Sequence, residues 1–157
     1  MSLNIRKAAA GDESVILGFI RELADYEKLS HEVVATPEHL ARTLLCDHPK
    51  AFALIAELDG APVGFALYFF NYSTFLGKHG LYLEDLYVQA AHRGAGAGKA
   101  LLAELARVAL ENDCGRMEWS VLDWNEPAIR FYEALGARRL KEWQICRLTG
   151  PALAQYA

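Results

Sequence analysis

The segment from Arg93 to Lys99, with the sequence Arg-Gly-Ala-Gly-Ala-Gly-Lys, is the part of the chain whose composition points most directly to chemistry. Its glycines let the backbone approach a ligand closely and leave several N–H groups exposed at the start of a predicted helix. Those donors and the helix dipole suit a phosphate group. A plain turn from a strand into a helix has a similar composition, so the glycines alone leave both interpretations open.

Two common phosphate-binding patterns do not fit this segment. A Walker A loop has four residues between its first glycine and Gly-Lys, and then Ser or Thr. Here three residues separate Gly94 from Gly98, and Ala100 follows Lys99. A dinucleotide fingerprint is spaced G-x-G-x-x-G, whereas this chain has glycines at every second position. The spacing therefore disfavours a kinase and a dehydrogenase.

The elements that must position this segment follow from hydrophobic periodicity and turn signals. Strands are predicted at residues 3–6, 51–58, 63–72, 81–88 and 117–122, with two more short strands between Arg138 and Leu148. Asp59-Gly60 is a hairpin signal between the second and third strands. Helices are predicted after a capping Asp12, from Thr36-Pro37, from the glycine-rich turn, and from Asn125 to near Gly136. This order predicts an α/β (α+β) fold, a mixed sheet with helices on both faces.

Composition limits the classes of function. The 157 residues are enough for a single domain, 1–157, and 53% are hydrophobic while 23% are charged, which is typical of a globular protein. The formal net charge of −4 argues against a nucleic-acid partner and mildly favours a cationic substrate.

Membrane and metal signals are weak. The longest apolar stretches, residues 51–56 and 63–70, are far shorter than the roughly 20 residues of a membrane span, and the N-terminus does not resemble a signal peptide. We therefore expect no membrane partner and a cytoplasmic location. The three cysteines and five histidines show neither a disulfide framework nor metal-ligand spacing, so no metal is expected.

Arg93-x-x-Gly96-x-Gly98 resembles the acetyl-CoA pyrophosphate loop R/Q-x-x-G-x-G/A of the GNAT superfamily of N-acetyltransferases. Three further segments, residues 21–30, 82–88 and 121–137, are similar to the diamine acetyltransferases and to the related thialysine acetyltransferases. The resemblance runs from about Ile5 to Leu148. It implies the GNAT fold, a central mixed and mostly antiparallel sheet flanked by helices, with acetyl-CoA at the splayed central strands.

The resemblance also implies which residues contact acetyl-CoA. The predicted strand 81–88 would pair through its backbone with the pantetheine amides, as an added strand does. The backbone N–H groups of the glycine-rich turn would hold the pyrophosphate, and Asn125 would contact CoA, although Asn also caps helices well. The expected cofactor residues are Leu86, Tyr87, Val88, Arg93, Gly94, Ala95, Gly96, Ala97, Gly98, Lys99, Asn125 and Tyr132.

Acetyl transfer needs a neutral amine and benefits from a proton for the departing thiolate. Tyr132 matches the tyrosine that the family places beside the CoA sulfur, and a phenol of pKa ~10 can protonate a thiolate. Glu84 is the candidate base, because an amine of pKa ~10.4 is mostly protonated at pH 7. In a regular strand Glu84 and Asp85 point to opposite faces, but this family carries a bulge in that strand. A helix-packing Tyr132 and a solvated Glu84 are the structural alternatives.

On the substrate side, the resemblance implies the set Tyr26, Glu27, Glu84, Asp85 and Trp143. Glu118 stands where the diamine enzymes have a histidine, and residues 121–125 are more similar to the thialysine branch. The expected substrate is therefore a diamine or polyamine, or a thialysine- or lysine-like amino acid, and a homodimer is expected from the resemblance. A protein or peptide acetyltransferase and a non-catalytic CoA-binding module of the same fold are the alternatives.

Overall fold

The computed structural model describes residues 1–157. The chain forms two compact units, Met1–Ser120 and Val121–Ala157. In neither unit is a helix long and apolar enough to traverse a lipid bilayer.

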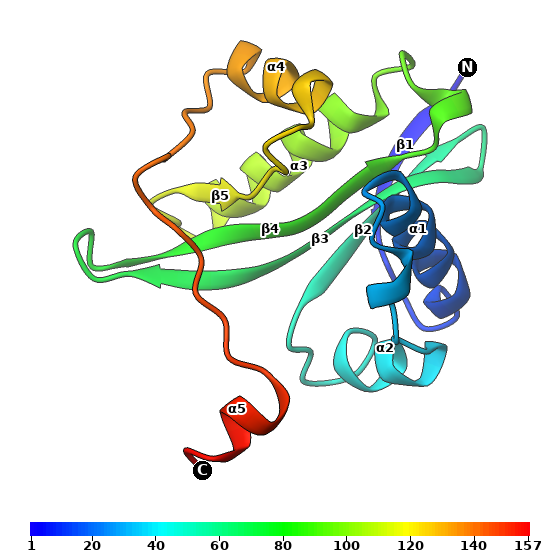
Figure 1. Cartoon of the computed structure of the whole chain (residues 1–157). Coiled ribbons are helices and arrows are strands. Elements are labelled where there is room, and N and C mark those ends of the chain that lie inside the picture. Colours follow the sequence, from blue (N-terminus) through cyan, green and yellow to red (C-terminus); the bar gives the residue numbers. More distant parts are fainter. The chain divides into compact units, whose positions relative to one another are not determined.

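The first unit is built on a five-stranded sheet with the order β1-β2-β3-β4-β5 (Figure 1). Strands β1 to β4 pair antiparallel with one another in this order, and β5 runs parallel to β4. The mixed, mostly antiparallel sheet predicted from the sequence is thus confirmed. The strands are β1 (Leu3–Lys7), β2 (Phe52–Leu58), β3 (Ala61–Ser73), β4 (Lys78–Val88) and β5 (Met117–Trp119).

The turn between β2 and β3 confirms the hairpin signal in the sequence. Asp59 and Gly60 both have positive φ, at 51° and 84°. Two successive residues in this region make the tight turn whose twist matches that of the flanking strands, and Asp-Gly adopts it readily.

Strand β4 carries a β-bulge at Glu84. On β3, Leu67 pairs with Asp85 and the next residue, Tyr68, pairs with Leu83, so Glu84 has no partner on β3. A bulge reverses the alternation of faces along a strand. The side chains of Glu84 and Asp85 therefore do not follow the strict alternation between opposite faces of the sheet that a regular strand would give them.

The pairing of β4 with β5 stops directly before this bulge. The parallel ladder joins Leu81–Leu83 to Met117–Trp119 and goes no further. The prediction that the fifth strand continues to Leu122 is therefore wrong, because the bulged part of β4 offers it no continuing ladder. Residues 84–88 of β4 have no strand on their β5 side.

Helices cover both faces of the sheet, as the sequence predicted (Figure 1). Helix α1 (Glu13–Tyr26) and helix α2 (Pro37–Thr43) pack on one face, where Ile16, Phe19 and Leu40 meet Ile55 and Phe65. Helix α3 (Ala97–Glu111) covers the other face with its buried residues Leu101, Leu102, Leu105 and Val108.

The two helix starts on the α1–α2 face differ. Thr36 caps α2 as predicted, and its hydroxyl accepts a hydrogen bond from the His39 N–H at 3.2 Å. Asp12 does not cap α1 with its side chain, contrary to the sequence prediction. Its carboxylate is instead held by Arg6, at 2.8 Å, and by the Ala9 N–H. The ion pair lowers the pKa of Asp12 below its ordinary value and ties β1 to the start of α1.

The second unit contains α4 (Glu126–Ala134) and α5 (Gly150–Ala154). Helix α4 ends before Gly136, whose φ is 96°, in agreement with the sequence. The two short strands predicted between Arg138 and Leu148 are absent. The segment contains apolar residues, among them Leu140, Trp143 and Ile145. A strand also needs a neighbour for its backbone, and the only backbone bond from within this segment is a turn from the Trp143 N–H to the Leu140 carbonyl.

Candidate active site

The glycine-rich turn leads from the end of β4 into α3. A short 3₁₀ turn, Ala90–His92, is followed by Gly94 and Gly96, whose φ angles are 90° and 88°. Gly96 is the N-cap of α3. This backbone conformation favours glycine, and a Cβ built on either residue meets no atom within 4 Å. Glycine is therefore required here by the turn geometry, while the space beside the turn is open.

The start of α3 offers donors to that open space. The N–H groups of Ala97, Gly98 and Lys99 lie in the first turn of a 15-residue helix, where no intrahelical acceptor exists. The helix dipole adds partial positive charge at the same end. This arrangement fits the pyrophosphate of CoA, and the β4 edge at residues 84–88, which lacks a strand partner, fits the amides of its pantetheine arm.

The exposed side chain of Arg93 contacts the end of β4 and the end of α1. Its Nε donates a hydrogen bond to the Val88 carbonyl at 3.0 Å. Its guanidinium carbon lies 5.4 Å from the centre of the Tyr26 ring and 5.8 Å from the centre of the Tyr87 ring. Three predicted cofactor residues, Tyr87, Val88 and Arg93, thus meet one predicted substrate residue, Tyr26, at this point.

Three predicted substrate-side carboxylates interact at the bulge. Glu84 is the exposed bulged residue, Asp85 follows it, and Glu27 stands directly after the last residue of α1. Burial, followed by the negative charges of Glu84 and Glu27, raises the pKa of Asp85 from its ordinary value of 3.8 to about 7. Burial also raises the pKa of Glu27.

This cluster can accept a proton and hold a cation. A carboxyl group that titrates near pH 7 is a better proton acceptor than an ordinary aspartate, because its basicity is closer to that of the proton donor. Reasoning from the sequence selected Glu84 as the base and gave Asp85 only a substrate role. The raised pKa of Asp85 depends on burial and on a carboxylate from α1, which no local pattern reveals.

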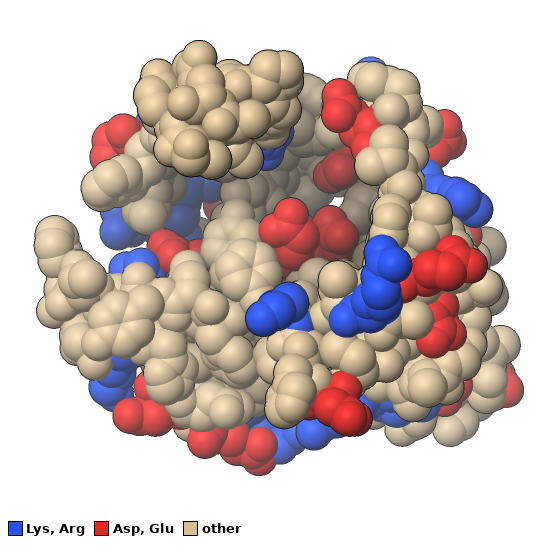
Figure 2. Space-filling view, turned by 90° about the horizontal axis from the view of Figure 1, so that it is seen from below, with Lys and Arg blue, Asp and Glu red and all other residues tan.

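The carboxylate cluster of Glu27, Glu84 and Asp85 does not belong to a uniformly acidic surface. Acidic and basic side chains are both present on the molecular face shown in Figure 2. Glu118 on β5 is paired with Arg116 at 3.1 Å. No group of three or more His, Cys, Asp or Glu side chains is arranged to hold a metal ion.

The remaining predicted site residues belong to the second unit. Asn125 is buried, and its side-chain oxygen caps α4 by accepting a hydrogen bond from the Ala128 N–H at 3.4 Å. Tyr132 is half-buried in α4, with its ring 5.7 Å from that of Phe131. Trp143 is 74% exposed. The capping role of Asn125 is therefore observed, while the cofactor and substrate roles of these three residues stay predictions.

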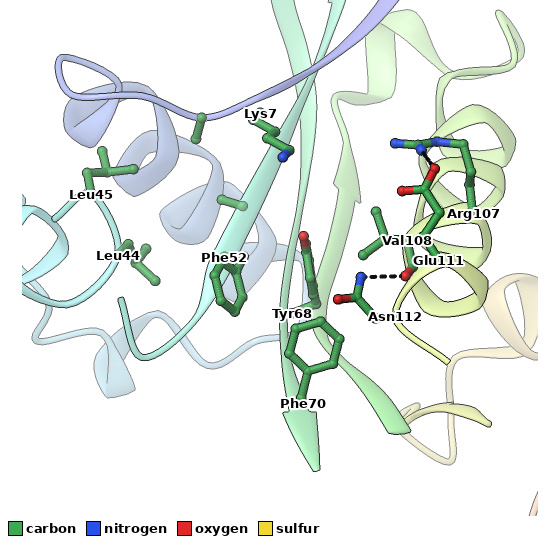
Figure 3. A pocket seen from close by; sticks show the side chains of 12 residues that line it. Lys7, Leu44, Leu45, Phe52, Tyr68, Phe70, Arg107, Val108, Glu111 and Asn112 are labelled. Carbon is green, nitrogen blue, oxygen red and sulfur yellow. Dashed lines mark hydrogen bonds and ion pairs between the residues drawn. The ribbon is translucent and has the colours of Figure 1, made fainter. Parts of the chain in front are cut away.

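A separate cavity of about 310 Å³ lies between the sheet and the C-terminal half of α3 (Figure 3). Phe52, Tyr68 and Phe70 line its sheet side, and Arg107 and Asn112 line it from α3 and its end. None of the predicted site residues lines this cavity. The glycine-rich turn and the carboxylate cluster, rather than this cavity, therefore form the candidate active site of the first unit.

Comparison with known proteins agrees with this arrangement. The model of the acetyltransferase (GNAT) family matches residues 16–137. A thialysine N-epsilon-acetyltransferase of Bos taurus is 42% identical over 164 residues, which cover 98% of this chain and 96% of the relative. An L-ornithine N5-acetyltransferase of Arabidopsis thaliana is 34% identical, covering 98% of this chain and 87% of the relative.

A solved integron cassette protein from V. cholerae is similar to this chain with a TM-score of 0.81 and 26% identity, covering 99% of this chain and 98% of that structure. The match to the family model spans most of the chain, and the two enzymes are similar over nearly its whole length. The chain belongs to the GNAT family of acetyltransferases.

Proposed function

We propose that this chain transfers the acetyl group of acetyl-CoA to the primary amine of a small molecule that carries a second charged end. A thialysine- or lysine-like amino acid is the first candidate substrate, and a diamine or polyamine is the second. The observation that carries the proposal is the cluster of Glu27, Glu84 and Asp85 beside the unpaired edge of β4.

The residues that would hold acetyl-CoA are those of the β4 edge and the glycine-rich turn. The backbone of Leu86, Tyr87 and Val88 would pair with the pantetheine amides, and the N–H groups from Arg93 to Lys99 would hold the pyrophosphate. Asn125 would add a contact from the start of α4. When bound, acetyl-CoA supplies a thioester whose carbonyl carbon accepts the amine.

Residues of this chain would transfer two protons, accepting one from the amine and donating one to the sulfur. An amine can attack only after its ammonium has lost a proton, and Asp85 or Glu84 would accept that proton directly or through a water molecule. A carboxyl group of pKa about 7 is half-ionised near neutral pH and so can accept a proton and release it again. Tyr132 would donate its hydroxyl proton to the departing sulfur, since the pKa values of a phenol and a thiol are similar.

Glu27 would select substrates with a distal positive charge, and Tyr26 and Trp143 are proposed as further substrate contacts. A distal ammonium paired with a partly buried carboxylate gains a charge-assisted hydrogen bond of about 1.5–3 kcal/mol. That free energy corresponds to a preference of roughly tenfold to a hundredfold over a neutral-ended amine of equal length. The similarity to thialysine and ornithine acetyltransferases over nearly the whole chain supports an amino acid as the substrate.

A comparison of amines tests this proposal. Thialysine, lysine, ornithine, putrescine, spermidine and butylamine are assayed for CoA release at constant ionic strength. We expect the substrates with a second charged end to exceed butylamine in kcat/KM by about tenfold or more. Glu27→Gln should remove much of the difference between putrescine and butylamine. Equal rates with butylamine would show that these carboxylates are not a substrate anchor.

We further propose that residues 1–157 act as one functional domain in a cytoplasmic homodimer, without a nucleic-acid or membrane partner. The exposed side chains of Trp143, Ile145 and Leu148 support a dimer, because large apolar residues exposed along one segment are suited to contact with a second copy. Light scattering should give twice the monomer mass, and a monomer at micromolar concentration would contradict this proposal.

A further inference from the structure

Arg93 joins the glycine-rich turn to the C-terminal end of α1. Its hydrogen bond to the Val88 carbonyl holds the end of β4, at 3.0 Å. Its guanidinium group lies against the rings of Tyr26 and Tyr87 at 5.4 Å and 5.8 Å. Tyr26 is the last residue of α1, and Arg93 directly precedes the first glycine of the turn.

A second set of contacts joins the same two elements one helical turn earlier. The Tyr87 hydroxyl donates to the Glu22 carboxylate at 3.1 Å, and the Gln89 side-chain amide donates to the same carboxylate at 3.2 Å and 3.3 Å. Glu22 and Tyr26 are four residues apart and so lie on one face of α1. The end of β4 and the C-terminal half of α1 are thus joined by Arg93 and by Glu22.

This junction lies between the two halves of the candidate site. The N–H groups that fit a pyrophosphate begin on one side of Arg93. On the other side, Tyr26 is followed directly by Glu27, whose charge acts on Asp85. The guanidinium group lies against two rings and its Nε is bonded to a carbonyl, so it can fix the position of these neighbours.

We infer that Arg93 is a positioning residue which fixes the Tyr26–Glu27 end of α1 relative to the CoA-binding turn, and that it sets the affinity for the amine rather than for the phosphates. This inference rests on the proposed function. An arginine suits the task because its planar group stacks on rings while its Nε donates a hydrogen bond, whereas lysine can place only a charge over the rings.

The test separates the two affinities. Arg93→Ala should raise KM for thialysine about twofold to thirtyfold, in the range expected for lost cation–π contacts. It should change the dissociation constant for CoA, measured by calorimetric titration, by less than about threefold. Arg93→Lys should restore part of the amine affinity. Arg21→Ala, which removes an exposed positive charge from α1, is the matched control and should leave both constants unchanged.

A double-mutant cycle with Tyr26→Leu tests the contact itself. Once Tyr26 is removed, Arg93→Ala should cost little further amine affinity, because neighbours that act together are not additive. Additive effects, or a loss of CoA affinity at unchanged KM for thialysine, would overturn the inference and make Arg93 a phosphate ligand.

Failure of the proposed function is distinguishable from failure of this inference. If the wild-type chain acetylates no amine, the proposed function fails. The same Arg93–Tyr26 cycle is then measured by urea unfolding, which needs no activity. A non-zero coupling free energy between Arg93 and Tyr26 in unfolding supports the positioning role, and a coupling free energy of zero overturns it.

Discussion

Replacing Asp85 by Asn should stabilise the protein, and the gain should depend on pH. Asn has nearly the same shape as Asp but carries no charge at any pH in the assay. In the folded protein, burial and the charges of Glu84 and Glu27 raise the pKa of Asp85 to about 7, against an ordinary value of 3.8. The unfolded chain releases this proton at lower pH than the folded chain does.

The sign and size follow from this difference. Between pH 4 and 7 the folded state binds a proton that the unfolded state has lost, so the free energy of unfolding of the wild type falls as pH rises. At about 1.4 kcal/mol for each pKa unit, the contribution of Asp85 amounts to about 4 kcal/mol, and the fall levels off above pH 7. The free energy of unfolding of the Asn variant does not fall in this way, because its side chain does not titrate. It should match the wild type near pH 4 and exceed it by up to about 4 kcal/mol at pH 8.

Urea unfolding of both proteins at several pH values from about 3 to 8 measures this difference. Asp12→Asn is the matched control with the opposite sign, because Arg6 lowers the pKa of Asp12. That variant should be less stable than the wild type at pH 7, and its deficit should shrink as the pH falls below 4. A constant difference between Asp85→Asn and wild type across the whole pH range would refute the reasoning about the carboxylate cluster.

Three predictions concern activity. If Asp85 accepts the amine proton, kcat/KM of the wild type should rise with pH through about 7, and Asp85→Asn should lack that limb; an identical profile in the variant would exclude the role. Tyr132→Phe should lower kcat about 10²- to 10⁴-fold at nearly unchanged CoA affinity, whereas full kcat would mean a packing role, provided that chemistry limits the rate. A Cβ on Gly98 meets only the Val88 Cγ2, at 3.8 Å, so Gly98→Ala should fold and bind CoA. Gly98→Val should fold but bind CoA much more weakly in calorimetry, and equal affinities of the two variants would remove the turn from the cofactor site.

The features that the sequence predicted well are those set by local chemistry. Asp59-Gly60 adopts the turn that such a pair favours, and Thr36 caps its helix. Gly94 and Gly96 take positive φ between a strand and a helix, as a close-approach turn requires. Each of these needs only a few neighbouring residues, so the sequence contains the whole signal.

The features that the sequence could not give depend on partners far along the chain. The bulge at Glu84 depends on how β3 and β4 pair, and the high pKa of Asp85 depends on a carboxylate at the end of α1. Arg93 belongs to a loop motif, but its ring contacts arise from the fold. The segment 138–148 contains several large apolar residues, yet no neighbouring strand pairs with it.

The most direct test of the central claim is to identify the product. The purified chain is incubated with acetyl-CoA and thialysine, and the products are followed by mass spectrometry and by thiol release. We expect singly acetylated thialysine to form in a one-to-one ratio with free CoA, and Asp85→Asn to slow its formation. Release of CoA without acetylated amine, or no turnover of any amine in the panel, would contradict the assignment of this site to amine acetylation.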